Sequence, residues 1–123
     1  MLYHRAIGDK TSLAVFLFTY IIIKMKKEEL FDTVIGVVSE CTGIGREEIL
    51  RCKSEECTDV RCIAVQVLGR YLTDAQIAKL MGITSRGVNY IRGTFLLRSK
   101  KWFVRSNYEA VLKRIGSNAL TAV

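Results

Sequence analysis

The feature that most constrains this chain is the spacing of small, turn-forming and apolar residues over residues 74–93. The segment reads DAQIAKLMGITSRGVNYIRG. Ala78 is small enough to let two helices approach closely, and Gly82, four residues later, can adopt a positive φ without strain. The apolar contacts between the two helices would come from Ile77, Met81, Ile83, Val88 and Ile91. This spacing predicts a helix-turn-helix, with an ordinary helical hairpin as the alternative.

Capping residues mark where the two helices begin. Thr73 is followed three residues later by Gln76, which is the pattern of a capping box and predicts a helix start at residue 74. Thr84 or Ser85 can cap the second helix.

The outer face of the second helix carries side chains suited to reading DNA bases. If Val88, Ile91 and Phe95 point inward, the opposite face presents polar side chains. Arginine can bind guanine, and asparagine adenine, through two hydrogen bonds each. The predicted base contacts are Ser85, Arg86, Asn89 and Tyr90. Gly87 costs the helix about 1 kcal/mol relative to alanine, and both a close approach to DNA and neutral drift would explain it.

All of the excess positive charge lies in the C-terminal part of the chain. Residues 1–72 hold ten Lys and Arg against ten Asp and Glu, whereas residues 73–123 hold nine against two. A one-sided basic field is typical of polyanion binding, although a solubilising surface or a membrane-binding surface has the same sign. The predicted phosphate contacts are Lys79, Thr84, Arg92, Arg98, Lys100, Lys101 and Arg105. We expect Trp102 and Phe103, which interleave with them, to be buried in the core.

The other helices are predicted from apolar spacings of three and four and from their end signals. Helices are expected over 26–41, 45–50, 58–72 and 106–115, with a loop over 53–57 and stops at Gly43 and Gly116. The expected fold is therefore all-α. A helical domain spans 26–116, and a tail follows over 117–123.

The N-terminal segment differs from the rest. Residues 13–23 read LAVFLFTYIII, which is shorter than the roughly 20 residues of a membrane span, and lysines rather than a cleavage site follow. We expect residues 1–25 to be an apolar extension, and one hypothesis is that it derives from a misplaced start codon. A buried strand or core helix is the alternative. No membrane partner is expected, and the expected location is cytoplasmic, with the nucleoid.

The cysteines do not form a metal motif. Cys41, Cys52, Cys57 and Cys62 include no C-x-x-C pair, and the single histidine, His4, is distant in sequence. We therefore expect free thiols and neither a metal nor a cofactor. No nucleophile–base pair is evident, so no catalytic residue is assigned and enzyme activity is not expected.

Residues 37–91 resemble the C-terminal DNA-binding domain of the bacterial replication initiator DnaA, which has a Trp-repressor-like fold. The resemblance lies in residues 42–44 (TGI), 47–50 (EEIL), 60–64 (VRCIA) and 77–82 (IAKLMG). It implies a DnaA-like helical bundle that contains the helix-turn-helix. The chain looks like the small stand-alone relatives of that domain found in bacteria and their mobile elements.

Two departures separate the chain from the initiator family. The family carries GGRDHTTV at the start of the recognition helix, whereas residues 81–88 read MGITSRGV and lack the Asp-His pair. The family's basic minor-groove loop is replaced by residues 54–57 (SEEC), with Asp59 following. There is also no G-x-x-x-x-G-K-[ST] nucleotide-binding motif. Fold and DNA binding carry over, whereas origin recognition and ATP-dependent initiation do not.

The expected function is sequence-specific binding of double-stranded DNA. The chain would serve as a bacterial transcriptional regulator or as an accessory protein of a mobile element or of replication. The sequence leaves open whether the chain binds paired DNA half-sites as a homodimer. The alternative is a protein-interaction module on a helix-turn-helix scaffold that no longer reads DNA, suggested by Glu55, Glu56 and Gly87.

Overall fold

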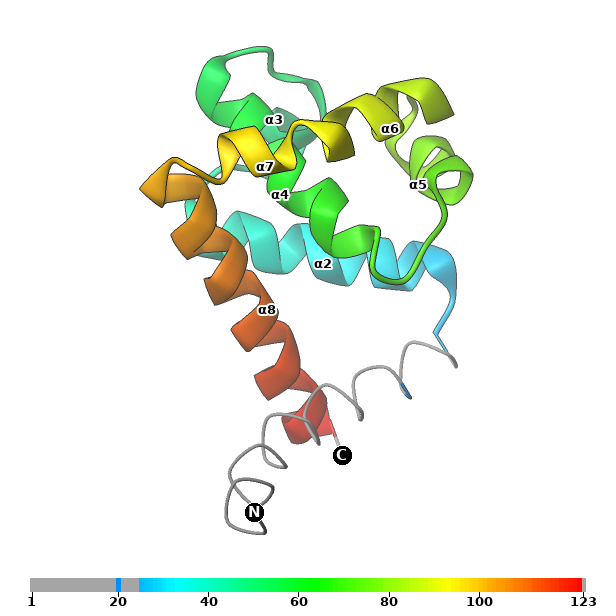
Figure 1. The fold of residues 1–123 in the computed structure, drawn as a ribbon. Coiled ribbons are helices and arrows are strands. Elements are labelled where there is room, and N and C mark those ends of the chain that lie inside the picture. The colour runs from blue at the N-terminus through cyan, green and yellow to red at the C-terminus, as the bar shows by residue number, and fades with distance from the viewer. Residues whose placement is uncertain (1–19, 21–24, 123) are drawn as a thin grey trace, which may run out of the picture.

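The computed structural model describes residue 20 and residues 25–122, with side chains described as far as residue 116. Every element in this part of the chain is a helix, as the sequence predicts (Figure 1). The elements are α2 (Lys27–Thr42), α3 (Arg46–Arg51), α4 (Glu55–Leu68), α5 (Asp74–Met81), α6 (Ser85–Gly93), α7 (Phe95–Arg98) and α8 (Trp102–Ala122). The predicted extension over 1–25 lies outside the described residues, apart from Tyr20 and Met25.

Helix α4 is the centre of the fold. It contacts α2, α3, α6, α7 and α8, and Ile63 and Leu68 on it are fully buried. Helix α2 packs against both α4 and α8, whereas α5 packs mainly on α6. Figure 1 shows the α5–α6 pair at one end of the molecule and α8 at the other. The arrangement leaves one side of α6 without a helix over it.

The sequence of α2 accounts for both its buried side and the residue at which it ends. Val34, Ile35 and Val38 recur at spacings of one, three and four, and all are fully buried on one side of α2. The helix ends at Gly43, which has a φ of 77° and whose N–H donates to the carbonyl of Ser39 at 2.8 Å. The predicted stop at Gly43 is therefore confirmed.

The predicted loop over 53–57 is wrong in its second half. Helix α4 begins at Glu55, three residues before the predicted start, and the hydroxyl of Ser54 caps it by accepting from the N–H of Cys57 at 3.2 Å. Glu55 and Glu56 occupy the first turn, where the helix dipole stabilises acidic side chains. Residues 55–57 are thus the N-terminal turn of α4. The helix also ends earlier than predicted, at Leu68.

The last helix is longer than predicted. It begins at Trp102 and continues through Gly116 to Ala122, so the predicted start at residue 106 and the predicted stop at Gly116 are both wrong. Asn107, next to the predicted start, lies inside the helix, and its side-chain amide donates to the carbonyl of Phe103 at 2.8 Å. Buried Val104, Val111 and Ile115 share one face of α8, which packs against α2 and α4. This packing sustains the helix through residues that favour caps and turns.

The expectation that Trp102 is buried is also wrong. Its side chain is 72% exposed. Trp102 precedes buried Val104 by two residues, about 200° around the helix, and therefore faces away from the core. Phe103, which is also predicted to be buried, packs against the core and is partly buried. Nearby, the rings of Phe95 and Tyr108 meet edge to face with centroids 4.9 Å apart, which joins α7 to α8.

Candidate nucleic-acid interface

The two helices predicted over residues 74–93 are present as α5 and α6, joined by a turn at Gly82. Thr73 and Gln76 form the predicted capping box: the hydroxyl of Thr73 accepts from the N–H of Gln76 at 3.2 Å, and the N–H of Thr73 donates to Oε1 of Gln76 at 2.9 Å. Gly82 has a φ of 76°, and its N–H donates to the carbonyl of Ala78 at 2.8 Å. The turn therefore requires the glycine that the spacing predicts at this position.

Helix α6 is held by its cap and by one apolar side. The hydroxyl of Thr84 accepts from the N–H of Gly87 at 3.0 Å, so Thr84 is the cap and Ser85 is the first helical residue. Val88 is fully buried, and Ile91 packs against the core. A Cβ at Gly87 would lie 3.3 Å from the capping hydroxyl of Thr84. Glycine at this position therefore relieves crowding around the cap, a reason that sequence reasoning missed.

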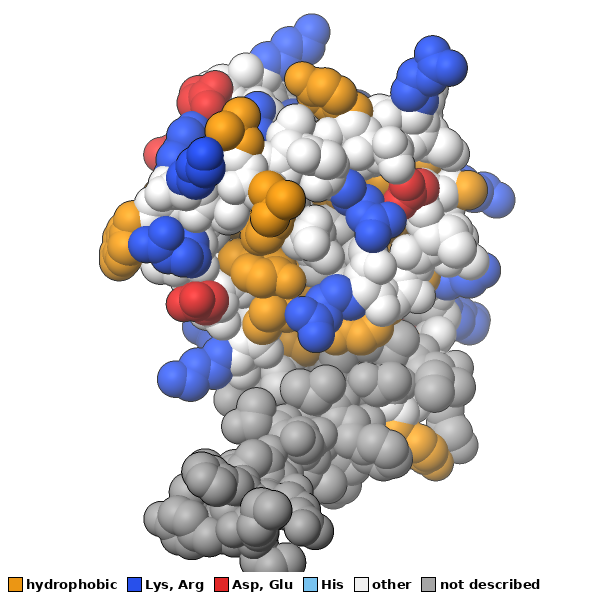
Figure 2. Space-filling view, in the orientation of Figure 1, with side chains coloured by type: hydrophobic (Ala, Val, Ile, Leu, Met, Phe, Trp, Pro, Cys, Tyr) orange, Lys and Arg blue, Asp and Glu red, His pale blue; other side chains and the backbone are white. Residues whose placement is uncertain are grey.

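The four predicted base-reading side chains lie on the exposed side of α6. Ser85, Arg86, Asn89 and Tyr90 are all exposed, and Tyr90 is 71% exposed. Within the described residues, Arg86 makes no hydrogen bond or ion pair and is free to contact a ligand. Figure 2 shows basic side chains projecting from the upper edge of the molecule, the edge that α3 and α6 form in Figure 1.

Asn89 and Arg92 share an acidic partner that sequence reasoning did not assign. Nδ2 of Asn89 donates to Oδ2 of Asp74 at 3.3 Å, and Nη1 of Arg92 pairs with Oδ1 of the same carboxylate. The hydrogen bond from Arg92, and to a lesser extent that from Asn89, lowers the pKa of Asp74 below its ordinary value. The first residue of α5 is thus tied to two residues of α6.

Two predicted phosphate contacts are engaged in an ion-pair cluster. Nη1 of Arg98 lies 2.7 Å from Oδ1 of Asp59, and Nζ of Lys101 lies 3.0 Å from Oδ2 of Asp59 and 2.7 Å from Oε2 of Glu55. The hydrogen bonds that Lys101 donates to Glu55 and Asp59 raise its pKa. Asp59 is buried, so this cluster fastens the α7–α8 junction to α4. Arg98 and Lys101 are therefore paired with acids of α4 and do not add free cations to the exposed side of α6.

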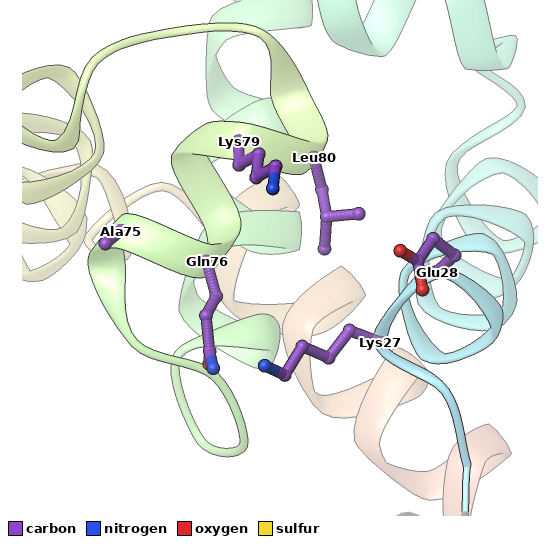
Figure 3. Close-up of a pocket in the computed structure, with 6 residues that line it drawn as sticks. All are labelled: Lys27, Glu28, Ala75, Gln76, Lys79 and Leu80. Carbon is purple, nitrogen blue, oxygen red and sulfur yellow. The ribbon is translucent and has the colours of Figure 1, made fainter.

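The other predicted phosphate contacts are exposed. Lys79, Lys100 and Arg105 have no ion pair within the described part of the chain. Lys79 borders a pocket of about 590 Å³ between α5 and the start of α2. Figure 3 shows the α5 side chains on one side of this pocket and Lys27 and Glu28 of α2 on the other. Because Glu28 lines it together with the two lysines, the pocket is not a purely cationic site.

The described residues hold no group of three or more His, Cys, Asp or Glu side chains that could bind a metal ion, and His4 lies outside them. All four cysteines are free thiols. Burial raises the pKa of Cys62, whereas hydrogen bonds with the side chains of Cys57 and Ser54 lower the pKa of Cys52 to about 7. No described helix combines the length and apolar character needed to cross a bilayer.

Comparisons with protein-family models, with curated proteins and with solved structures find no match to this chain. The fold class is therefore established by the described helices themselves. The function has to be inferred from the exposed side of α6 and the charges around it.

Proposed function

We propose that this chain binds double-stranded DNA in a sequence-specific manner, with α6 in the major groove and α5 against the backbone. The observation that carries the proposal is the exposed side of α6, which presents Ser85, Arg86, Asn89 and Tyr90 on a capped helix whose other side is fixed by buried Val88. An α-helix fits the major groove, where each base pair has a distinct pattern of donors and acceptors.

The side chains divide into base contacts and phosphate contacts. Arg86 has no competing partner among the described residues and suits guanine, whereas Asn89 suits adenine. Thr84, at the cap of α6, and Lys79, on α5, would contact phosphates, and Lys100 and Arg105 would extend the basic field. Arg98 and Lys101, paired with Asp59, contribute to that field without being free contacts.

The proposal includes a Trp-repressor-like or DnaA-like arrangement of the bundle. It is supported by the resemblance over residues 37–91 and by the packing of α6 on α4 next to α5. The initiator family has a basic minor-groove loop where this chain has Glu55 and Glu56 in the first turn of α4. Minor-groove contact at this point is therefore not part of the proposal. The proposed role is that of a bacterial transcriptional regulator, or of an accessory protein of a mobile element or of replication.

Selection of bound sequences from a random duplex pool, compared between wild type and Arg86→Ala, tests the proposal. Wild type should enrich one motif, and Arg86→Ala should lose roughly 1–3 kcal/mol of site affinity and relax one base-pair position. The matched control is Arg114→Ala on α8, which removes the same charge from an exposed pair with Glu40 and should leave the motif unchanged.

Salt dependence gives a second readout of the same binding. Log affinity should fall linearly with log salt, with a slope of about −0.9 per phosphate contacted. Salt-insensitive binding, or an Arg86→Ala protein that selects the wild-type motif, would contradict the proposal.

A second candidate function, a protein-interaction module, is favoured by one observation. Leu96 and Leu97 on α7 are 82% and 68% exposed, and exposed Trp102 follows them at the start of α8. Tryptophan is enriched in protein interfaces, and exposed apolar side chains that form a contiguous patch mark interaction sites. Failure to shift any duplex at low salt, together with specific capture of a protein partner that Leu97→Asp abolishes, would favour this function over DNA binding.

A further inference from the structure

Asp74 places a carboxylate on the side of the molecule proposed to face DNA. It is the first residue of α5, and its side chain is 24% exposed. A carboxylate repels phosphate groups, so an acidic residue here works against DNA binding unless it serves another purpose. Its two partners, Asn89 and Arg92, are both on α6.

The contact with Asn89 fixes which way the amide faces. An asparagine side chain has two N–H donors on one atom and a carbonyl acceptor on the other, whereas an ionised carboxylate only accepts. Asp74 can therefore bond only to the Nδ2 edge of Asn89, as it does at 3.3 Å. This contact leaves the carbonyl oxygen and the second N–H available. An adenine edge in the major groove offers N7 as an acceptor and N6 as a donor, which matches this pair.

Arg92 holds the carboxylate in place from the other side. Its Nη1 pairs with Oδ1 of Asp74, and its guanidinium lies over Gly69, where a Cβ would be 3.0 Å from Nε and 3.1 Å from Cζ. The absence of a side chain at Gly69 thus makes room for the guanidinium. Because the pKa of Asp74 is lowered, mainly by Arg92, the carboxylate remains ionised and able only to accept at neutral pH.

We propose that Asp74 is a specificity-determining positioning residue, which orients the amide of Asn89 for adenine while Arg92 braces the carboxylate and neutralises its charge. This inference rests on the proposed DNA-binding function. In this inference Arg92 holds the carboxylate of Asp74 in place and does not contact a phosphate. Asp74 itself does not touch the DNA.

The deciding variant is Asp74→Asn, which keeps the size of the side chain but can also donate. In selection from a random duplex pool, Asp74→Asn should lose about tenfold or more of the preference for adenine at one position, and the other positions should keep theirs. Asn89→Ala should relax the same position, and the double variant should lose no more than either single variant. The matched control is Asp32→Asn, which removes an exposed carboxylate of α2 that is paired with Arg46 of α3 and contacts neither Asn89 nor Arg92.

The outcomes separate this inference from the function on which it rests. Removal of a negative charge would strengthen binding to every sequence, and Asp32→Asn reports that effect alone. If Asp74→Asn selects the wild-type motif, or loses preference at all positions equally, the role of Asp74 is overturned while DNA binding stands. If wild type selects no motif at all, the DNA-binding proposal fails.

The free protein offers an independent readout by NMR. The side-chain amide resonances of Asn89 should shift on acidification with the titration of Asp74, at a midpoint below that of an ordinary aspartate. In Asp74→Asn this titration should disappear, while the backbone spectrum reports that the fold is retained. Asn89 resonances that do not respond to acid in wild type would overturn the contact itself.

Discussion

Individual glycines in this chain have different structural roles, and the difference lies in the backbone. Gly82 has a φ of 76° and connects α5 to α6, a conformation that places an L side chain's Cβ too close to the following carbonyl. Gly36 lies inside α2, is exposed, and has open space where a Cβ would go. Gly82 is thus required by the turn, whereas Gly36 only weakens its helix.

Alanine substitutions at these two glycines should therefore have opposite effects. Gly82→Ala should lower the free energy of unfolding by about 1–2 kcal/mol, because the turn holds the residue in the left-handed region. Gly36→Ala should raise it by up to about 1 kcal/mol, since alanine is the better helix former. Urea unfolding followed by circular dichroism measures both. A Gly82→Ala protein as stable as wild type would show that the turn does not depend on the positive φ.

At the scale of elements, ion pairs add to apolar packing in attaching α7 and the beginning of α8 to α4. Helix α7 has no fully buried residue, but Arg98 at its end pairs with Asp59 of α4 at 2.7 Å. The side chains of Asp59 and Arg98 are 6% and 20% exposed, so the pair is largely shielded from water. A shielded ion pair is costly to break from one side because the remaining charge loses its partner.

Arg98→Ala should consequently destabilise the fold by about 2–3 kcal/mol, a value limited by the continued contact of Lys101 with Asp59. Arg51→Ala is the matched control, because its pair with Glu47 is exposed and should contribute no more than about 0.5 kcal/mol. Chemical denaturation of the two variants beside wild type gives the comparison. Equal losses would mean that burial of Asp59 does not strengthen the pair.

At the scale of the whole molecule, the excess positive charge of residues 73–123 is partly paired with acids elsewhere in the fold. Arg98 and Lys101 contact the first turns of α4, and Arg114 of α8 pairs with Glu40 of α2 at 2.8 Å. The net charge of +7 is unaffected by this pairing. The pairing instead makes the free energy of unfolding depend on pH, since each ion pair requires both partners to be charged.

The free energy of unfolding should fall in acid, because Glu55 and Asp74 become protonated and lose their ion pairs. Their pKa values are lowered, chiefly by Lys101 and Arg92 respectively, so their contributions are complete above the ordinary carboxyl pKa. These contributions are lost as the pH falls through the lower pKa of the folded state, below about pH 4. In Glu55→Gln and Asp74→Asn, the free energy of unfolding should therefore depend less steeply on pH in this range. Unfolding measured from pH 7 to pH 2 checks this, and acid slopes identical to wild type would contradict it.

The helix boundaries show how far sequence patterns reach in this chain. The start of α5, the turn at Gly82 and the cap at Thr84 follow from neighbours within four residues. The sequence located the first two and left the cap open between Thr84 and Ser85. The extent of α8 was missed because residues 106–109 look like a helix start, and packing of Val104 and Val111 against α2 and α4 carries the helix through them.

Helices α5 and α6, the turn between them and the residues on the exposed side of α6 could thus be predicted from residue order alone, because caps, positive φ and apolar periodicity act over a single helical turn. Which basic residues are free could not be identified in that way. Arg86 and Arg98 are both arginines in a basic stretch, but only Arg98 has a buried acid beside it, 39 residues away in the sequence. Likewise, Asp74 and Asn89 are 15 residues apart and meet only when α5 packs on α6. The residue type determines whether a side chain is charged, whereas the packing of the helices determines which side chain it pairs with.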